Sequence, residues 1–139
     1  MEPVPVSDFE LEKHQGPYED WPATTRLLFK EQFTGTQIPA HVIEAQFRLG
    51  SRFLIATSDD CPFEEATGFF LLDGDFKVLA SLKKGTPYAT WRLQNIEPLS
   101  PDQLRVSFGE SETWILSIRS RRPFFFGSLL SLKRETRLS

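Results

Sequence analysis

Four carboxylates crowd one short stretch of the chain and are the strongest candidates for chemistry. They are Asp59, Asp60, Glu64 and Glu65, and they follow directly on the apolar run 53–56. Carboxylates that a fold holds together repel one another and raise each other's pKa, so such a cluster binds a cation or supplies a proton donor. The stretch is therefore consistent with a divalent-cation site or with a general acid and base pair.

A solvated loop accounts for the same residues, and we favour it. Asp59 or Asp60 can cap a turn, and Pro62 can end the preceding strand. The spacing of the acids does not match a calcium loop, which has a central glycine and a terminal glutamate. We therefore predict no metal site here, and we interpret the run 73–75, Asp-Gly-Asp, as a hairpin turn rather than a set of ligands.

Nucleophilic catalysis has little support in the residue types. Cys61 is the single cysteine, which excludes an internal disulfide and a zinc site with several thiolates. A reactive cysteine must be a thiolate, and the flanking carboxylates disfavour that charge. His14 and His41 have no paired spacing, and no nucleophile elbow, phosphate loop or dinucleotide fingerprint is present. We predict no catalytic residue and no cofactor, and a reducing, cytoplasmic location.

The basic tail is the second candidate for binding. Arg121 and Arg122 lie beside the phenylalanine run 124–126, and the stretch 119–139 has six basic residues against one acid. Arginines can bind phosphates while phenylalanines stack on bases, and the triplet could also enter a partner's groove or a membrane surface. We favour a buried terminal strand beside the acidic N-terminal stretch, because apolar triplets are mostly core and the net charge is −3.

Two hairpins are expected to position these residues. Alternating runs at 42–58 flank Gly50 and Ser51, the order preferred by a type II′ turn. That turn places Phe47 opposite Leu54, Ala45 opposite Ala56 and Glu44 opposite Thr57. One face is then apolar and the other mixed, which is typical of a sheet covered on one side and partly covered on the other.

The second hairpin is predicted at 69–82, around Asp73 and Gly74. A two-residue turn there places Phe69 opposite Val78 and Leu71 opposite Phe76. Further strands are predicted at 24–33, 91–96, 104–108 and 114–118, with turns at 100–103 and 109–112. Short strands separated by frequent turns indicate an all-β, mainly antiparallel meander folded into a β-sandwich or small barrel, with room for one short helix.

The chain has 139 residues, the length of one ordinary domain. Leu, Ile, Val and Phe account for 41 of them, too many for a disordered chain. We predict an irregular, acidic, proline-rich arm over 1–23, a β-rich domain over 24–122 and a basic aromatic tail over 123–139 that packs on the domain. The acidic start is unlike an export signal, and the apolar runs are too short to span a membrane.

These observations favour a small, non-catalytic interaction protein of the inhibitor, adaptor or immunity type. We expect it to bind another protein, rather than nucleic acid or a membrane, through Asp59, Asp60, Glu64 and Glu65, with Arg121 and Arg122 as further binding candidates. One alternative is a carboxylate-based hydrolase acting on a sugar or phosphoryl substrate. A second alternative is single-stranded nucleic-acid binding through the tail.

Overall fold

The computed structural model describes residues 3–13, 16, 23–58, 66–84, 93–108, 112–119 and 129–135. All regular structure in these ranges is β-strand, and every strand pair is antiparallel. The strands form three sheets that are not closed into a barrel. The prediction of an antiparallel, all-β, sandwich-like meander is confirmed.

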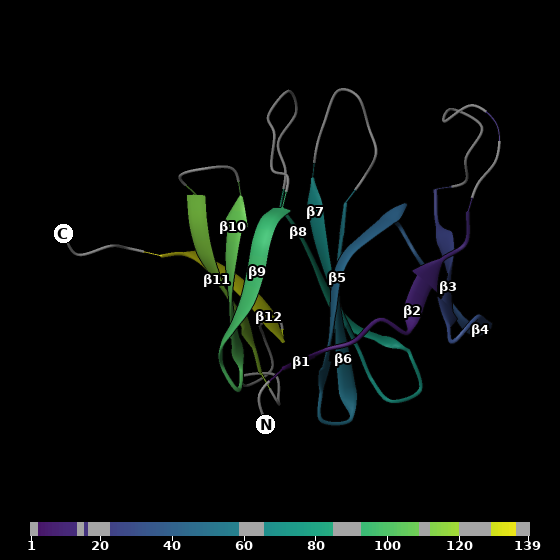
Figure 1. Cartoon of the computed structure of the whole chain (residues 1–139), viewed down its shortest axis with the longest axis horizontal. Coiled ribbons are helices and arrows are strands. Elements are labelled where there is room, and N and C mark those ends of the chain that lie inside the picture. The colour runs from purple at the N-terminus through teal and green to yellow at the C-terminus, as the bar shows by residue number, and fades with distance from the viewer. Residues whose placement is uncertain are drawn as a thin grey trace.

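The central sheet has the strand order β1-β5-β6-β7-β8 and lies between the other two sheets (Figure 1). Its strands are β1 (Val4–Pro5), β5 (Val42–Leu49), β6 (Arg52–Ser58), β7 (Thr67–Leu72) and β8 (Val78–Lys84). β6 and β7 are the innermost strands, and each carries a run of consecutive buried residues. Such runs are typical of strands that are covered on both faces.

The β5–β6 hairpin has the predicted turn. Gly50 has a φ of 65°, as the first turn residue of a type II′ hairpin requires. Ala45 pairs with Ala56 and Phe47 pairs with Leu54, as expected. The predicted pair of Glu44 and Thr57 is wrong, because a register shift at Glu44 makes Ile43 the partner of Thr57.

The predicted register of the β7–β8 hairpin is wrong. Phe69 pairs with Leu82 rather than Val78, and Leu71 pairs with Ala80 rather than Phe76. The turn is longer than two residues, because the Asp73 N–H donates to the Lys77 carbonyl at 2.9 Å. Phe76 therefore lies in the turn, where it has a φ of 67°, and not in a strand.

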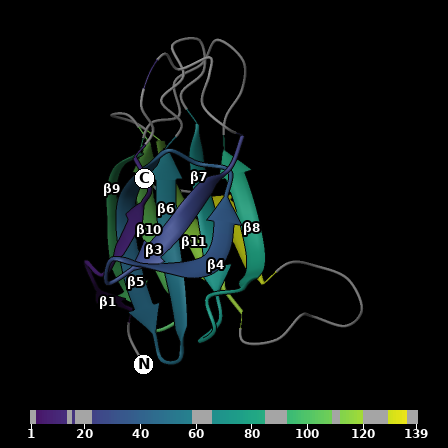
Figure 2. The same ribbon diagram turned by 90° about the vertical axis from the view of Figure 1, so that its right-hand side faces the viewer.

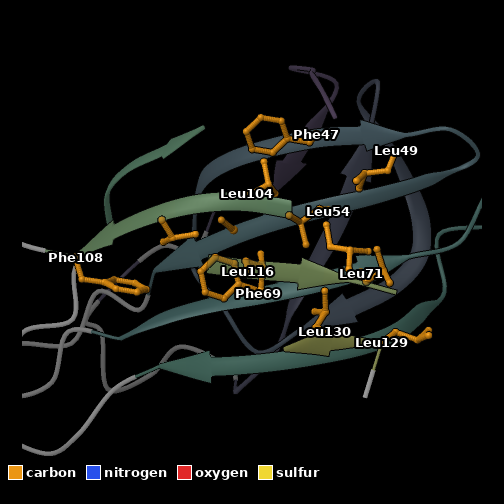
Figure 3. Packing of buried hydrophobic residues seen from close by; sticks show 13 residues of the cluster. Phe47, Leu49, Leu54, Phe69, Leu71, Leu104, Phe108, Leu116, Leu129 and Leu130 are labelled. Carbon is orange, nitrogen blue, oxygen red and sulfur yellow. The ribbon is translucent and has the colours of Figure 1, made fainter. Parts of the chain in front are cut away.

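The second sheet has the order β12-β11-β10-β9 and packs on one face of the central sheet. Its strands are β9 (Leu93–Ser100), β10 (Gln103–Phe108), β11 (Glu112–Ile118) and β12 (Leu130–Arg134). The main core fills the space between these two sheets, and its largest side chains are leucines and phenylalanines (Figure 3). β12 lies in the predicted tail, but after the phenylalanine run 124–126 for which a buried terminal strand was predicted; that run lies outside the described residues.

The third sheet has the order β2-β3-β4 and covers part of the opposite face of the central sheet (Figures 1 and 2). Its strands are β2 (Phe9–Leu11), β3 (Thr25–Phe29) and β4 (Gln32–Ile38). The single strand predicted over 24–33 is wrong, because the chain reverses at Lys30 and Glu31. These residues have φ values of 49° and 70°, and neither is a residue type that marks such a turn.

Four phenylalanines hold the third sheet on the central one. Phe9, Phe29, Phe53 and Phe76 come from β2, β3, β6 and the β7–β8 turn, and the distances between their ring centroids range from 4.8 to 5.9 Å. We call these residues the phenylalanine cluster. It packs with buried Leu27, Ile55 and Leu72, so the second face of β6 and β7 is also buried.

Residues from both ends of the chain take part in the sheets. Val6 in the predicted arm donates its N–H to the Gln46 carbonyl at 3.1 Å. The Gln46 side chain holds the next part of the arm, because it accepts from the Phe9 N–H at 2.9 Å and donates to the Phe9 carbonyl at 3.0 Å. The arm thus contains two short strands where irregular structure was expected, while the division of the chain at 23 and 122 stays a prediction.

The turn residue Phe76 provides a test of this packing. Replacing Phe76 with alanine should lower the free energy of unfolding by about 2 kcal/mol, because the cluster loses one aromatic ring. Replacing it with glycine should leave the protein about 1 kcal/mol more stable than the alanine variant, because glycine adopts positive φ without strain. Urea unfolding followed by circular dichroism measures both values. An alanine variant as stable as the wild type, or more stable than the glycine variant, would contradict this arrangement.

Candidate functional site

The predicted binding residues lie outside the described part of the chain. This holds for the four acids Asp59, Asp60, Glu64 and Glu65, for Arg121 and Arg122, and also for Cys61, His14 and the phenylalanine run 124–126. The structure does place the residues on either side of the four acids, and these define where the acidic segment 59–65 is attached.

The acidic segment is attached to the two innermost strands. It leaves β6 after Ser58 and returns at Ala66, just before β7, and Ser58 pairs with Thr67 across the two strands. Ala66 and Thr67 are buried. Both attachment points lie at one end of the central sheet (Figure 2), and the pairing of Ser58 with Thr67 joins them.

A small pocket of about 180 Å³ lies beside these attachment points, and we call it the rim pocket. It is lined by Pro39, Thr57, Gly68, Phe70, Ser81, Leu82 and Lys83. Thr57 and Gly68 are the pair directly before Ser58 and after Thr67. The rim pocket combines an aromatic ring, two hydroxyl groups and one lysine, and its volume suits a single side chain.

Gly68 is required at its position by its neighbours. A Cβ atom on Gly68 would lie 2.8 Å from Thr57 Oγ1 and 3.1 Å from the Phe70 ring. The Thr57 hydroxyl donates to the Gly68 carbonyl at 3.4 Å, and Thr57 is buried. The absence of a side chain at position 68 therefore lets β6 and β7 pair closely beside the rim pocket.

A larger hollow of about 390 Å³ opens on one lateral side of the sandwich, and we call it the lateral groove. Its apolar walls come from three separate strands and the residue after β1, and they comprise Pro5, Val6, Ile43, Ala45, Phe47, Ile96 and Pro98. Glu44 and Gln46 are its polar lining residues. On the other lateral side β8 lies beside β12, so the two sheets meet there (Figure 2).

Glu44 connects the lateral groove to the base of the acidic segment. The Ser58 hydroxyl donates to Glu44 Oε1 at 2.6 Å, and Glu44 is exposed. The Gln46 amide is already bonded to the Phe9 backbone. Glu44 therefore provides the charge of the groove, and its carboxylate is bonded to Ser58, the residue that precedes the acidic segment in the chain.

Asp73 has a structural role, as predicted for the run 73–75. Its Oδ1 atom accepts from the N–H groups of Asp75 at 2.8 Å and Lys77 at 3.0 Å. The Phe76 N–H donates to the Asp73 carbonyl at 3.0 Å. The carboxylate that could have been a ligand therefore organises the turn that carries Phe76 to the phenylalanine cluster.

The outer face of the second sheet carries ion pairs that hold neighbouring strands together. Arg105 binds Glu135 through Nη2 at 3.1 Å and Glu97 through Nη1 at 3.5 Å. The pKa of Arg105 is raised above its ordinary value, chiefly by the hydrogen bond to Glu135. Arg134 pairs with Glu112 at 3.0 Å. The pairs with Glu97 and Glu112 link β9 to β10 and β11 to β12, and the pair with Glu135 links β10 to the residue after β12. All of them are at least partly exposed to solvent, so each contributes little to stability.

Sequence patterns did not reveal the lateral groove or the rim pocket, because each combines side chains from segments far apart in the chain. Among the described residues there is no group of three or more His, Cys, Asp or Glu that could hold a metal ion. Within the same ranges, no helix has the length and apolar character to cross a membrane. The comparisons with protein-family models, curated proteins and solved structures found no match to the chain.

Gly68 provides a test of the packing beside the rim pocket. Gly68→Ala should lower the free energy of unfolding by about 1 to 3 kcal/mol, because the new methyl group overlaps the Thr57 hydroxyl. The same substitution should cost less in a Thr57→Ala background, which lacks that hydroxyl. A urea double-mutant cycle gives both numbers. Equal costs in the two backgrounds would show that Thr57 is not the obstacle.

Asp73 provides a test of the turn. Asp73→Ala should lower the free energy of unfolding by about 1 to 2 kcal/mol, because two backbone N–H groups lose their acceptor. Asp73→Asn keeps an acceptor oxygen and should cost less than half as much. The neighbouring Asp75→Ala substitution serves as the control and should be close to neutral in thermal unfolding. An Asp75→Ala variant as destabilised as Asp73→Ala would contradict the role given to Asp73.

Proposed function

We propose that this protein is a non-catalytic interaction protein that binds a basic partner protein through its acidic segment. The observation that carries the proposal is the connection of four carboxylates, within seven residues, to the ends of β6 and β7, where Thr57, Ala66 and Thr67 are buried. Attachment to a well-packed support lowers the entropy that a binding surface loses when its partner docks. We further propose a cytoplasmic location, since a single cysteine provides no disulfide.

Charge distribution supports this proposal. The whole chain has a net charge of −3, and the acidic segment contributes four negative charges without a basic residue. Exposed Glu44, bonded to Ser58 at the end of β6, adds a further negative charge beside the lateral groove. A surface of one sign accelerates association with an oppositely charged partner and makes the rate depend on salt.

The experiment compares two variants that remove the same number of charges. The first carries D59N, D60N, E64Q and E65Q in the acidic segment. The second is a control that carries E10Q, E31Q, D75N and D102N, four exposed acids on other parts of the surface. Affinity purification from the source cells should retain a partner on the wild type and the control that the first variant retains poorly.

Association kinetics with the purified partner then give the decisive values. At low salt, the first variant should associate about tenfold more slowly than the wild type, and its rate should depend less on salt. The control should stay within about twofold of the wild type, because its charges lie away from the contact. Equal association rates for the first variant and the wild type would reject the acidic segment as the binding surface.

A further inference from the structure

We propose that the lateral groove binds an extended, apolar and basic segment of the partner, which continues along β5 from the point where β1 ends. This inference rests on the proposed function, because it names the kind of partner that the acidic surface receives. It concerns a different set of residues, all of which the structure describes.

An extended segment of the chain, β1, already occupies part of this edge of the central sheet. β1 is a short, extended, proline-containing strand that pairs with β5 at Phe47 and Arg48. Val6 makes a further backbone bond to Gln46, and the chain then turns away toward β2. Between Val42 and Ala45, no strand of the described residues pairs with the outer edge of β5. The chain itself thus shows how an extended segment lies here, and it leaves the next part of the edge uncovered.

The sandwich is open on the lateral side where β5 and β9 lie. The groove of about 390 Å³ lies where β5 and β9 leave the sandwich open, and Ile43, Ala45 and Ile96 line it. A hollow of this size is in the range of sites that bury several apolar groups. On the opposite lateral side β8 and β12 approach each other, so the two sheets are in contact there.

The edges formed by β8, β12 and β9 differ from the β5 edge in their charge or in their backbone. β8 ends in Lys83 and Lys84, and β12 contains Lys133 and Arg134, the latter paired with Glu112. Neither strand has an acidic residue that could receive a basic segment. No lysine or arginine lines the lateral groove, and exposed Glu44 supplies its charge. β9 has two register shifts and Pro98, which limit strand pairing on that side, so the segment lies against β5 and uses β9 as an apolar wall.

The test uses a phage-displayed library of random linear peptides, selected against the full chain. We expect the enriched peptides to combine apolar residues with lysine or arginine. A synthetic peptide of the enriched sequence should shift the amide NMR signals of Ile43, Ala45 and Ile96. Glu44→Lys should weaken its binding at least about tenfold, whereas the matched control Glu31→Lys, at the exposed β3–β4 turn, should change it less than about twofold.

Other results overturn the proposal, and they separate it from the function above. A peptide whose binding is lost with D59N, D60N, E64Q and E65Q but kept with Glu44→Lys would place the partner on the acidic segment alone. Enrichment of acidic peptides, or no enrichment, would reject the lateral groove as a site for a basic segment. A dimer in sedimentation that Glu44→Lys dissociates would identify a second copy of this chain as the occupant. Glu44→Ala removes the charge but keeps the groove. A Glu44→Ala variant that binds the peptide as tightly as the wild type would therefore also overturn the role of Glu44.

Discussion

The burial of β6 and β7 on both faces is the constraint on which the rest of the structure depends. On one face Leu54, Ala56, Phe69 and Leu71 pack against the second sheet, and on the other face Ile55 and Leu72 pack beneath the third. A sheet that is covered twice cannot alternate apolar and polar residues, and these two strands accordingly carry almost continuous apolar runs. The acidic segment connects the end of β6 to the beginning of β7.

The packing of the third sheet on the central sheet depends on aromatic side chains rather than on strand pairing. None of the described strands pairs the third sheet with the central one, so the contact consists of side chains, above all the phenylalanine cluster. One of its rings, Phe76, is placed by a turn with unfavourable φ, and Asp73 stabilises that turn through two hydrogen bonds. The unfavourable φ of Phe76 is thus offset by the packing of its ring in the phenylalanine cluster. The same cluster holds the N-terminal residues on the sheet through Phe9.

The sequence predicted the fold class and one hairpin in detail, for reasons that can be named. The pattern 42–58 succeeds because Gly50 marks the turn and the alternation around it is regular, and it fails only at Glu44, where a bulge leaves no trace in residue type. The 69–82 pairing fails because Asp73 organises a longer turn than Asp-Gly normally specifies. The β3–β4 turn was missed because Lys30 and Glu31 resemble strand residues. Of the candidate site, the four acids stay a prediction from the sequence, whereas the lateral groove and the rim pocket depend on tertiary packing that one sequence does not reveal.

Both the fold and the proposed function require β6 and β7 to be the least mobile part of the chain. Native-state hydrogen exchange, followed by NMR with increasing denaturant, tests it most directly. The account predicts that the amides of Leu54, Ile55, Phe69 and Phe70 exchange only through global unfolding, with opening free energies equal to the free energy of unfolding. Exchange of these amides through local opening, while the second sheet stays protected, would contradict the account.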